Sequence, residues 1–132
     1  GVSANLFQDT FIDISPLPRT ANFFSDPNDG LPFVDYDPTI ARELLQQERF
    51  EDYLTVNAIG GKSWKIGDKF IGLFVSVNNM LNETYKTGGF EQGRSANYRT
   101  LLEDQSNPKR VFGPKYWYGR GTTYFVNLNY RF

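Results

Sequence analysis

Aromatic and basic side chains gather between residues 83 and 117, where they could bind a ligand or another protein. Aromatic rings stack on cationic and apolar groups, and guanidinium groups bind carboxylates or phosphates through paired hydrogen bonds. The residues concerned are Phe90, Arg94, Tyr98, Arg99, Lys109, Arg110, Tyr116 and Trp117. The same side chains could instead pack two loops against each other. The sequence favours packing over ligand contact.

The first loop of the chain, residues 15–48, is acidic and therefore complements this basic stretch. It contains Asp26, Asp29, Asp35, Asp37, Glu43 and Glu48 against Arg19 and Arg42. Opposite charges attract across a protein surface even when no ligand is present. We therefore expect the two loops to attract each other.

Residues suited to catalysis are scarce. The sequence has no Cys and no His, which excludes disulfides, thiolate nucleophiles, the usual zinc sites and histidine acid–base chemistry. The acid pairs Glu51-Asp52 and Glu103-Asp104 could transfer protons, but they lack a nucleophile, a pocket or a metal beside them. We expect them to be solvated charges, and we expect neither enzyme activity nor a cofactor.

The segment Asp26 to Gly30 resembles a calcium loop only weakly. Its acidic residues are off by one from the spacing of such a loop, and a Pro-Asn-Asp-Gly run is typical of an ordinary turn. Gly119-Arg120-Gly121 does not predict a phosphate loop, because it lies within an expected strand and not ahead of a helix. The prediction is therefore an ordinary turn at residues 26–30 with no metal site, and glycines that relieve crowding or permit a bend within the final strand.

Strands must position these residues, and the clearest is the final stretch, residues 116–132. Its alternate residues are apolar or aromatic: Tyr124, Val126, Leu128, Tyr130 and Phe132. A period of two indicates a strand, because successive side chains point to opposite faces. Aromatics at both ends with aliphatics between them are typical of a strand that crosses lipid. The stretch is also longer than the roughly 5–6 residues of most soluble strands.

Three further strands are predicted at residues 2–14, 50–66 and 69–82, separated by loops at 15–48 and 83–115. Asp37-Pro38 predicts the start of a short helix inside the first loop, and Gly67-Asp68 predicts a tight reversal. The residues expected to face lipid are Leu54, Val56, Ile71, Leu73, Val75, Val77, Tyr124, Val126, Leu128 and Tyr130. Lys62 falls on this apolar face, where it can reach the headgroup region unless a bulge turns it away.

The connections are long, very short and long, which matches the long extracellular loops and short periplasmic turns of outer-membrane barrels. The C-terminus is then periplasmic, and residues 1–132 form part of one barrel domain. Four strands cannot close a barrel, because about eight are needed and open edges in lipid leave backbone groups unpaired. Gly1 to Ala4 contain no signal peptide, so we expect either a removed signal or upstream sequence.

Composition agrees with this fold class, an all-β transmembrane antiparallel barrel segment. Aromatic residues make up 17% of the chain and the mean hydropathy is -0.49, as expected where one face of each strand is wet. No apolar run approaches the roughly 20 residues of a membrane helix. The net charge of -1 gives no reason to expect nucleic acid or an anionic lipid surface as the partner.

The run from Val77 to Tyr85, VNNMLNETY, resembles the "V-x-N-L-L-N-x-x-Y" phrase near the end of TonB-dependent outer-membrane receptors. The flanking runs Gly61 to Ile66 and Tyr85 to Arg94, and the closing Tyr124 to Phe132, extend the resemblance. It is strongest to the Bacteroidetes-type receptors that carry an N-terminal carboxypeptidase-regulatory-like domain. The resemblance implies a plugged barrel of about 22 strands, of which this chain supplies the last four.

The expected function follows from that resemblance. The chain is expected to contribute barrel wall and two extracellular loops to a receptor that takes up nutrients, powered through the TonB system by parts outside these residues. Its partners would be the upstream strands and plug or a partner chain, outer-membrane lipid, and the barrel insertion machinery, for which Phe132 would be the assembly signal. The alternative is a receptor-like barrel that serves a larger outer-membrane complex without transport.

Overall fold

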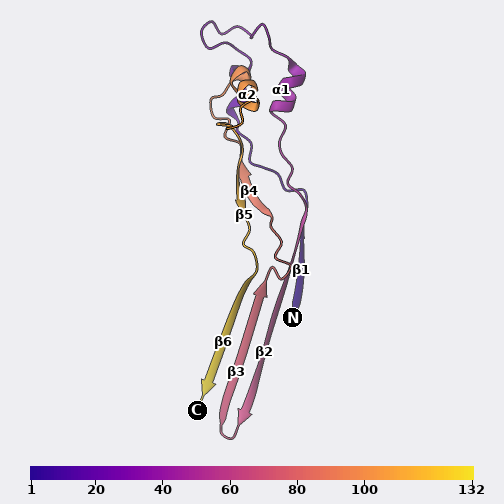
Figure 1. The fold of residues 1–132 in the computed structure, drawn as a ribbon, viewed down its shortest axis with the longest axis vertical. Helices are drawn as coiled ribbons and strands as arrows, with labels where there is room; N and C mark the ends of the chain where they lie inside the picture. Colours follow the sequence, from indigo (N-terminus) through magenta and orange to yellow (C-terminus); the bar gives the residue numbers. More distant parts are fainter. The chain divides into compact units, whose positions relative to one another are not determined.

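The computed structural model describes all residues from Gly1 to Phe132. Strands make up 40% of the chain and helices 16%, and the sheets are antiparallel, as the alternation predicted. None of the helices has the length and apolar character needed to span a membrane. The chain folds as two compact units (Figure 1). That residues 1–132 form part of one barrel domain stays a prediction. We call residues 1–9, 51–85 and 118–132 the sheet unit, and residues 10–50 and 86–117 the loop unit.

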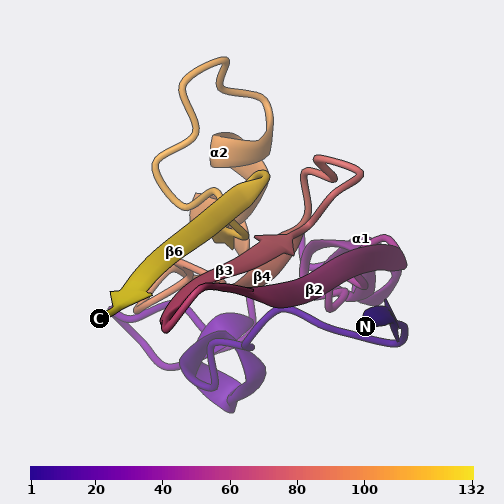
Figure 2. The same ribbon diagram turned by 90° about the horizontal axis from the view of Figure 1, so that it is seen from below.

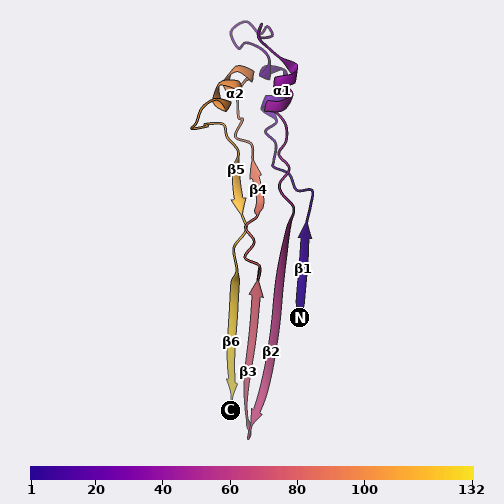
Figure 3. The same ribbon diagram turned by 45° about the vertical axis from the view of Figure 1, so that its right-hand side comes forward.

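The sheet unit is a four-stranded antiparallel sheet. Its strands are β1 (Val2–Phe7), β2 (Tyr53–Ile66), β3 (Lys69–Asn78) and β6 (Thr123–Arg131), in the order β1-β2-β3-β6 (Figure 3). The predicted reversal joins β2 to β3, and Gly67 there has a φ of 63°, which glycine adopts without strain. The strands twist relative to one another, as side-chain sterics require (Figure 2).

The register shows which residues share a face of the sheet. Leu54 lies opposite Leu6, and Val56 opposite Ala4. Directly paired residues point the same way, so three further rows extend that face: Ile71 with Tyr130, Leu73 with Leu128, and Val75 with Val126. Val77 pairs with both Ala58 and Tyr124 and completes the set. All ten residues predicted to face lipid therefore lie on one face of the sheet.

The first predicted strand, 2–14, is shorter than expected and ends at Phe7. Asp9 has a φ of 52°, in the left-handed region, which interrupts the extended backbone. Phe11 and Asp13 form only isolated bridges, to Arg49 and Phe90 respectively. The reason is visible in the sequence, where Gln8 to Thr10 blur the alternation that a paired strand needs.

The other strand boundaries also move. The strand predicted at 50–66 begins at Tyr53, and the one predicted at 69–82 ends at Asn78. The final stretch, 116–132, is divided into β5 (Lys115–Tyr118) and β6, because β5 pairs with β4 (Lys86–Phe90) in a separate two-stranded sheet. The segment 83–115 therefore contains a strand as well as the helix α2 (Tyr98–Gln105), neither of which was predicted.

Asn79 explains the asparagine-rich phrase that follows β3. Its side chain is buried and its φ is 50°, a conformation that Asn tolerates better than most residues. Its Nδ2 donates to the carbonyls of Glu83 (2.9 Å) and Arg120 (3.0 Å), and its Oδ1 accepts from the Glu83 amide (3.0 Å). The Thr122 hydroxyl donates to the Asn79 carbonyl at 2.8 Å. The chain that leaves β3 is thereby tied to the chain that enters β6.

The loop unit has a core of its own. The predicted helix is confirmed as α1 (Pro38–Leu44), where the Asp37 carboxylate caps the N-terminus by accepting from the Thr39 amide at 2.7 Å. Two 3₁₀ turns, η1 (Leu17–Arg19) and η2 (Ala21–Phe23), precede it. The buried core consists of Phe23, Phe33, Ala41, Ala96, Tyr98 and Leu101. Two segments far apart in the sequence therefore fold around common apolar contacts.

Candidate functional site

Tyr98, one of the eight candidate contact residues, is a core residue. It is 1% exposed, and its ring packs edge-on against Phe23 at 6.1 Å and Tyr36 at 5.1 Å between centroids. Its hydroxyl oxygen accepts a hydrogen bond from the Asp37 amide at 3.3 Å, beside the start of α1. Tyr98 therefore packs the two segments of the loop unit together and is not available to a ligand.

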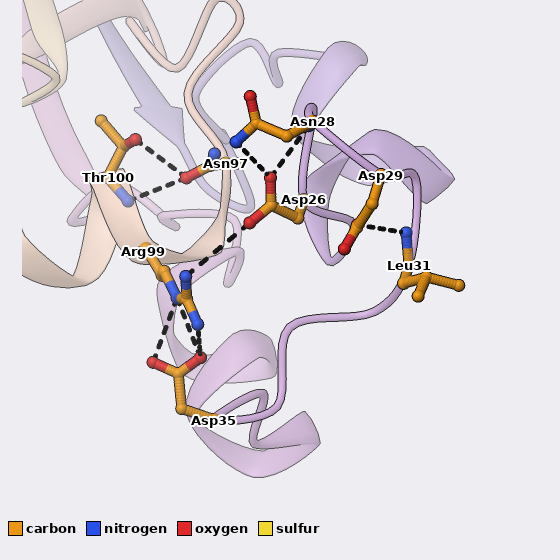
Figure 4. A network of polar contacts seen from close by, with 8 residues as sticks. All are labelled: Asp26, Asn28, Asp29, Leu31, Asp35, Asn97, Arg99 and Thr100. Carbon is orange, nitrogen blue, oxygen red and sulfur yellow. Dashed lines mark hydrogen bonds and ion pairs between the residues drawn. The ribbon is translucent and has the colours of Figure 1, made fainter.

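Arg99 forms the predicted attraction between the acidic and basic segments (Figure 4). Its guanidinium donates to the Asp35 carboxylate from Nε at 2.9 Å and from Nη2 at 2.7 Å, and it lies 4.4 Å from the Phe33 ring centroid. The hydrogen bond from Arg99 holds the pKa of Asp35 below its usual value. A second carboxylate, Asp26, lies 4.0 Å from the same guanidinium. The fork of Arg99 is therefore occupied within the unit.

The segment that resembles a calcium loop is an ordinary turn, as predicted. The Asp26 Oδ1 accepts from the Asn28 amide and from its Nδ2, both at 2.9 Å, and the Asp29 Oδ1 accepts from the Leu31 amide at 2.9 Å (Figure 4). Gly30 closes the turn with a φ of 71°. These carboxylates are engaged by the turn itself, and no cluster of three acidic side chains is placed to hold a metal ion.

A second polar cluster joins Glu48, Lys86 and Tyr116. The Lys86 ammonium lies 2.6 Å from the Glu48 Oε1, and the Tyr116 hydroxyl donates to Oε2 at 2.5 Å. Lys86 also lies over the Tyr116 ring at 3.8 Å and the Phe50 ring at 5.4 Å. Sequence reasoning missed Lys86 and Phe50, because their partners lie tens of residues away and no local pattern marks them.

The charges of this cluster are set by burial and hydrogen bonding together. Burial raises the pKa of Glu48, but the hydrogen bonds from Lys86 and Tyr116 outweigh it and leave the pKa of Glu48 lowered. Burial, followed by the hydrogen bond to Glu48, raises the pKa of Tyr116. The cluster is therefore an ionised Glu–Lys pair with a neutral tyrosine. It contains no activated nucleophile, and its geometry is that of a structural contact.

The remaining candidates divide into packed and exposed residues. Arg110 lies 3.7 Å from Asp104, and Phe90 lies 5.6 Å from Trp117 between ring centroids. Arg94 and Lys109 are exposed to solvent. Most of the eight residues therefore contact other residues of the loop unit, in agreement with the packing interpretation.

One cavity of the loop unit lies away from these residues. It has a volume of about 620 Å³ and opens to solvent between η2, the turn at residues 26–30 and the start of α2. Its lining includes Asn22, Ser25 and Ser95, and also Asn97, whose Oδ1 already caps α2 by accepting from the Thr100 amide at 3.0 Å. None of the eight candidate contact residues is among its lining residues. The lining of the cavity consists mainly of uncharged residues, and Asp26 is its only acidic or basic side chain.

The apolar face of the sheet is the second candidate surface. Tyr124, Val126, Leu128 and Tyr130 are each more than half exposed. Phe132, the predicted assembly signal, is 94% exposed, with its ring 6.0 Å from that of Tyr130. An exposed apolar surface that spans several strands marks a contact with lipid or with another protein.

The opposite face has a different character. Its paired rows carry mainly Asn, Ser, Thr and Gly, together with Lys65 and Arg131. Its large apolar side chains in these rows are Ile59, Phe70, Phe74 and Phe125, of which Phe74 and Phe125 are in contact at 6.4 Å between ring centroids. Gly72 lies beneath the Asn129 side chain, which occupies the place that a Cβ would need. The two faces of one sheet are therefore chemically distinct, one apolar and one polar with small residues.

Comparisons with protein-family models, with curated proteins and with solved structures gave no match to this chain. Its function is therefore inferred from the two faces of the sheet unit and from the contacts within the loop unit.

Proposed function

We propose that this chain forms part of the wall of an outer-membrane β-barrel, and that the barrel is a TonB-dependent receptor for nutrient uptake. In this proposal the apolar face of the sheet contacts lipid and the polar face lines the barrel interior. The loop unit then lies outside the cell. The apolar face carries the proposal.

The dimensions of the strands support a membrane-spanning role. A transmembrane strand needs about 9–11 residues, and β3 and β6 have 10 and 9, while β2 has 14. The apolar face has an aliphatic centre at Val75 and Val126, which pair directly. Tyr124 lies toward one end of this band, and Tyr130 with Trp64 toward the other. Aromatic residues at both ends of an apolar band are typical of strands that cross a bilayer.

The edges of the sheet support a larger barrel. β1 and β6 each pair with a neighbour on one side only. In lipid, every unpaired backbone group on such an edge would cost several kcal/mol, so a membrane-spanning sheet must close on itself. We infer that further strands pair with both edges. They come from the same barrel, which the resemblance puts at about 22 strands with a plug, or from a partner chain.

The connectivity supports the orientation. β1 leads into the loop unit and β2 returns from it, and Phe7 pairs with Tyr53 at that end of the sheet. β3 and β6 leave and return at the same end, where Asn78 pairs with Thr123. The two-residue turn lies at the opposite end. Short turns are periplasmic in outer-membrane barrels, so we infer that the loop unit is extracellular. Energy coupling rests on the resemblance in residues 77–85.

A cysteine scan of β6 in the assembled membrane protein tests this proposal, because the chain has no Cys of its own. Single substitutions at 124, 126, 128 and 130 should react with a lipid-soluble maleimide and resist a charged, membrane-impermeant one. Substitutions at 125, 127 and 129 should show the opposite preference. Equal reaction of both sets with the charged reagent would mean that the apolar face is exposed to water and does not lie in lipid.

The core of the loop unit favours a second role, in which the barrel binds a partner protein without transporting a solute. A self-supporting unit can present a rigid surface to a partner. The two roles are separated by measuring which solutes cells take up from the medium. One strain lacks the protein, and a second strain lacks the energy-coupling system. Loss of the same solute from uptake in both strains supports transport. Normal uptake in both, with loss of a co-purifying protein, supports the second role.

A further inference from the structure

The ionised side chains of the sheet unit are divided between its two ends. The end that joins the loop unit carries Asp9, Glu51, Asp52 and Glu83 against Arg120. The end with the Gly67-Asp68 turn carries Lys62, Lys65, Lys69 and Arg131 against Asp68. The strand segments between these ends contain no Asp, Glu, Lys or Arg. The turn end of the sheet is therefore basic and the other end acidic.

Each lysine at the turn end lies over an aromatic ring. The ammonium of Lys62 is 5.6 Å from the Trp64 ring centroid, that of Lys65 is 5.7 Å from Phe70, and that of Lys69 is 5.9 Å from Tyr130. Such contacts orient an ammonium group without neutralising it. Neither Lys62 nor Lys69 forms an ion pair with an acidic side chain. Their charges remain available to an anion outside the chain.

The register divides these cations between the two faces. Lys62 pairs with Leu73, and Lys69 pairs with Ile66, so both lie on the apolar face. No bulge interrupts this register. Lys65 and Arg131 both pair with Phe70 and lie on the polar face. Lys69 therefore lies in the last row of the apolar face beside the turn, and Lys62 lies one row inside the row of Trp64, Ile71 and Tyr130, from which its long side chain can extend toward the turn. Lys65 and Arg131 lie on the other face, in the row next to that of Lys69.

We propose that Lys62 and Lys69 bind the phosphate groups of anionic phospholipid headgroups in the leaflet at the turn end of the sheet. This inference rests on the proposed function, because it takes the apolar face to contact lipid. Lysine extends its apolar stem along the lipid-facing surface and keeps its ammonium at headgroup level, while Trp64 and Tyr130 occupy the interface. A cation beside an anionic membrane surface gains about 1 kcal/mol.

The test measures the lipid that neighbours Trp64 in the full barrel reconstituted in vesicles. The fluorescence emission of Trp64 is obtained as the difference between the parent and the Trp64→Phe variant. The same difference is measured in the background of each lysine variant. Acyl-brominated phosphatidylglycerol and acyl-brominated phosphatidylcholine then serve as quenchers at equal mole fraction. We expect phosphatidylglycerol to quench more strongly in the parent. We expect the double variant Lys62→Gln, Lys69→Gln to reduce the preference for phosphatidylglycerol, by about fivefold for each lysine removed.

Lys65→Gln is the matched control, since it removes the same charge from the same end of the sheet but from the polar face. It should leave the preference for phosphatidylglycerol unchanged. An equal loss in Lys65→Gln and in the double variant would overturn the proposal, because it would show a general charge effect of the turn. An unchanged preference in the double variant would overturn it as well.

Two further arms identify the source of the phosphate. Inorganic phosphate that abolishes the preference, at an ionic strength where chloride does not, would show a site for the free ion and overturn the lipid assignment. A stronger effect of lipid A than of phosphatidylglycerol would assign the turn end to the outer leaflet and overturn the phospholipid assignment. A preference that survives phosphate and exceeds that for lipid A supports it.

Failure of this inference is distinguishable from failure of the proposed function. If the alternating pattern of the β6 cysteine scan holds while the lipid preference is absent, the barrel wall stands and only the headgroup contact is wrong. If the cysteine scan shows no lipid-facing set, the proposed function fails first.

Discussion

The two units of this protein treat their apolar residues in opposite ways. Every buried hydrophobic residue of the chain belongs to the loop unit, and Ile12, Phe50 and Tyr98 are the most deeply buried. The sheet unit instead exposes Leu6, Trp64, Leu128 and other large side chains along one face. One unit therefore folds around its own core, and the other has an apolar surface with nothing of its own to cover it.

Under the proposed function, this difference reflects the solvent that surrounds each unit. The loop unit buries aromatic rings and surrounds them with paired charges, the usual arrangement of a domain in water. The sheet unit has most of its ionised groups toward its two ends, with Lys62 in the row of Leu73 and Leu128. Under the proposed function, this distribution suits a layer of hydrocarbon between two wet surfaces. A substitution in one unit should therefore change the stability of that unit and leave the stability of the other unit unchanged.

The largest expected effect is in the core of the loop unit. Tyr98→Ala removes a ring that is 1% exposed and should destabilise this unit by about 3–5 kcal/mol through lost contacts and an unfilled cavity. Proteolysis of the inserted protein should then cleave within residues 27–38, while the sheet keeps its resistance. Tyr98→Phe is the control, since it retains the ring and loses only the hydrogen bond from the Asp37 amide. Unfolding of the sheet along with the loop unit would contradict the separation of the two units.

The apolar face of the sheet should tolerate charge poorly. Val126 lies mid-strand opposite Val75, and Val126→Arg should lower the free energy of unfolding in bilayers by about 2–4 kcal/mol. Asn127→Arg, one residue away on the polar face, should change it little. Denaturant titration of each variant in vesicles makes the comparison. Equal tolerance at both positions would mean that neither face is in lipid, and the contrast between the two units would lose its basis.

Arg19 should contribute less to the free energy of unfolding than Tyr98 or Val126, because it lies at a half-buried position of the loop unit. Its guanidinium donates to the carbonyls of Ser15 at 2.8 Å and Leu45 at 2.7 Å, and to both carboxylate oxygens of Glu91. Arg19→Met should cost about 1–3 kcal/mol, between the values for surface and buried ion pairs. Arg42→Met, on an exposed part of α1, should cost almost nothing. Equal thermal shifts in the two variants would show that the Arg19 contacts do not hold the loop unit together.

The smallest expected effect is a dependence of the loop unit on pH. The pKa of Glu48 is lowered in the fold from its usual 4.5, so its stabilising contribution is present above that value and is lost as the pH falls through the lowered pKa. The pKa of Tyr116 is raised above its usual 10.0, so its contribution is present below that pH and is lost as the pH rises through the raised pKa.

Glu48→Gln should therefore flatten the acid side of the stability profile. Unfolding of the loop unit followed between pH 3 and 8 measures this, with Glu43→Gln as the control on an exposed side chain. An acid limit that is unchanged in Glu48→Gln would assign the pH dependence to other carboxylates.

Several features of the fold followed from the sequence alone. The period of two in residues 123–131 and 69–78 assigned Val126, Val75 and their neighbours to one face, because that assignment depends only on the geometry of an extended backbone. The Asp37-Pro38 pair marked the start of α1 for an equally local reason, since a capping carboxylate and a proline in the first turn act on adjacent residues.

Other features were decided only by contacts between distant residues. Tyr116 to Phe132 read as one strand, but pairing of β5 with β4 divides it, and that pairing joins segments some 30 residues apart. Nothing near Tyr98 in the sequence marks it as a core residue, because its neighbours Phe23 and Tyr36 come from the other segment of the loop unit. The same holds for Lys86, whose partner Glu48 lies 38 residues away. Local alternation determines the direction of a side chain, whereas its partner exists only once the chain has folded.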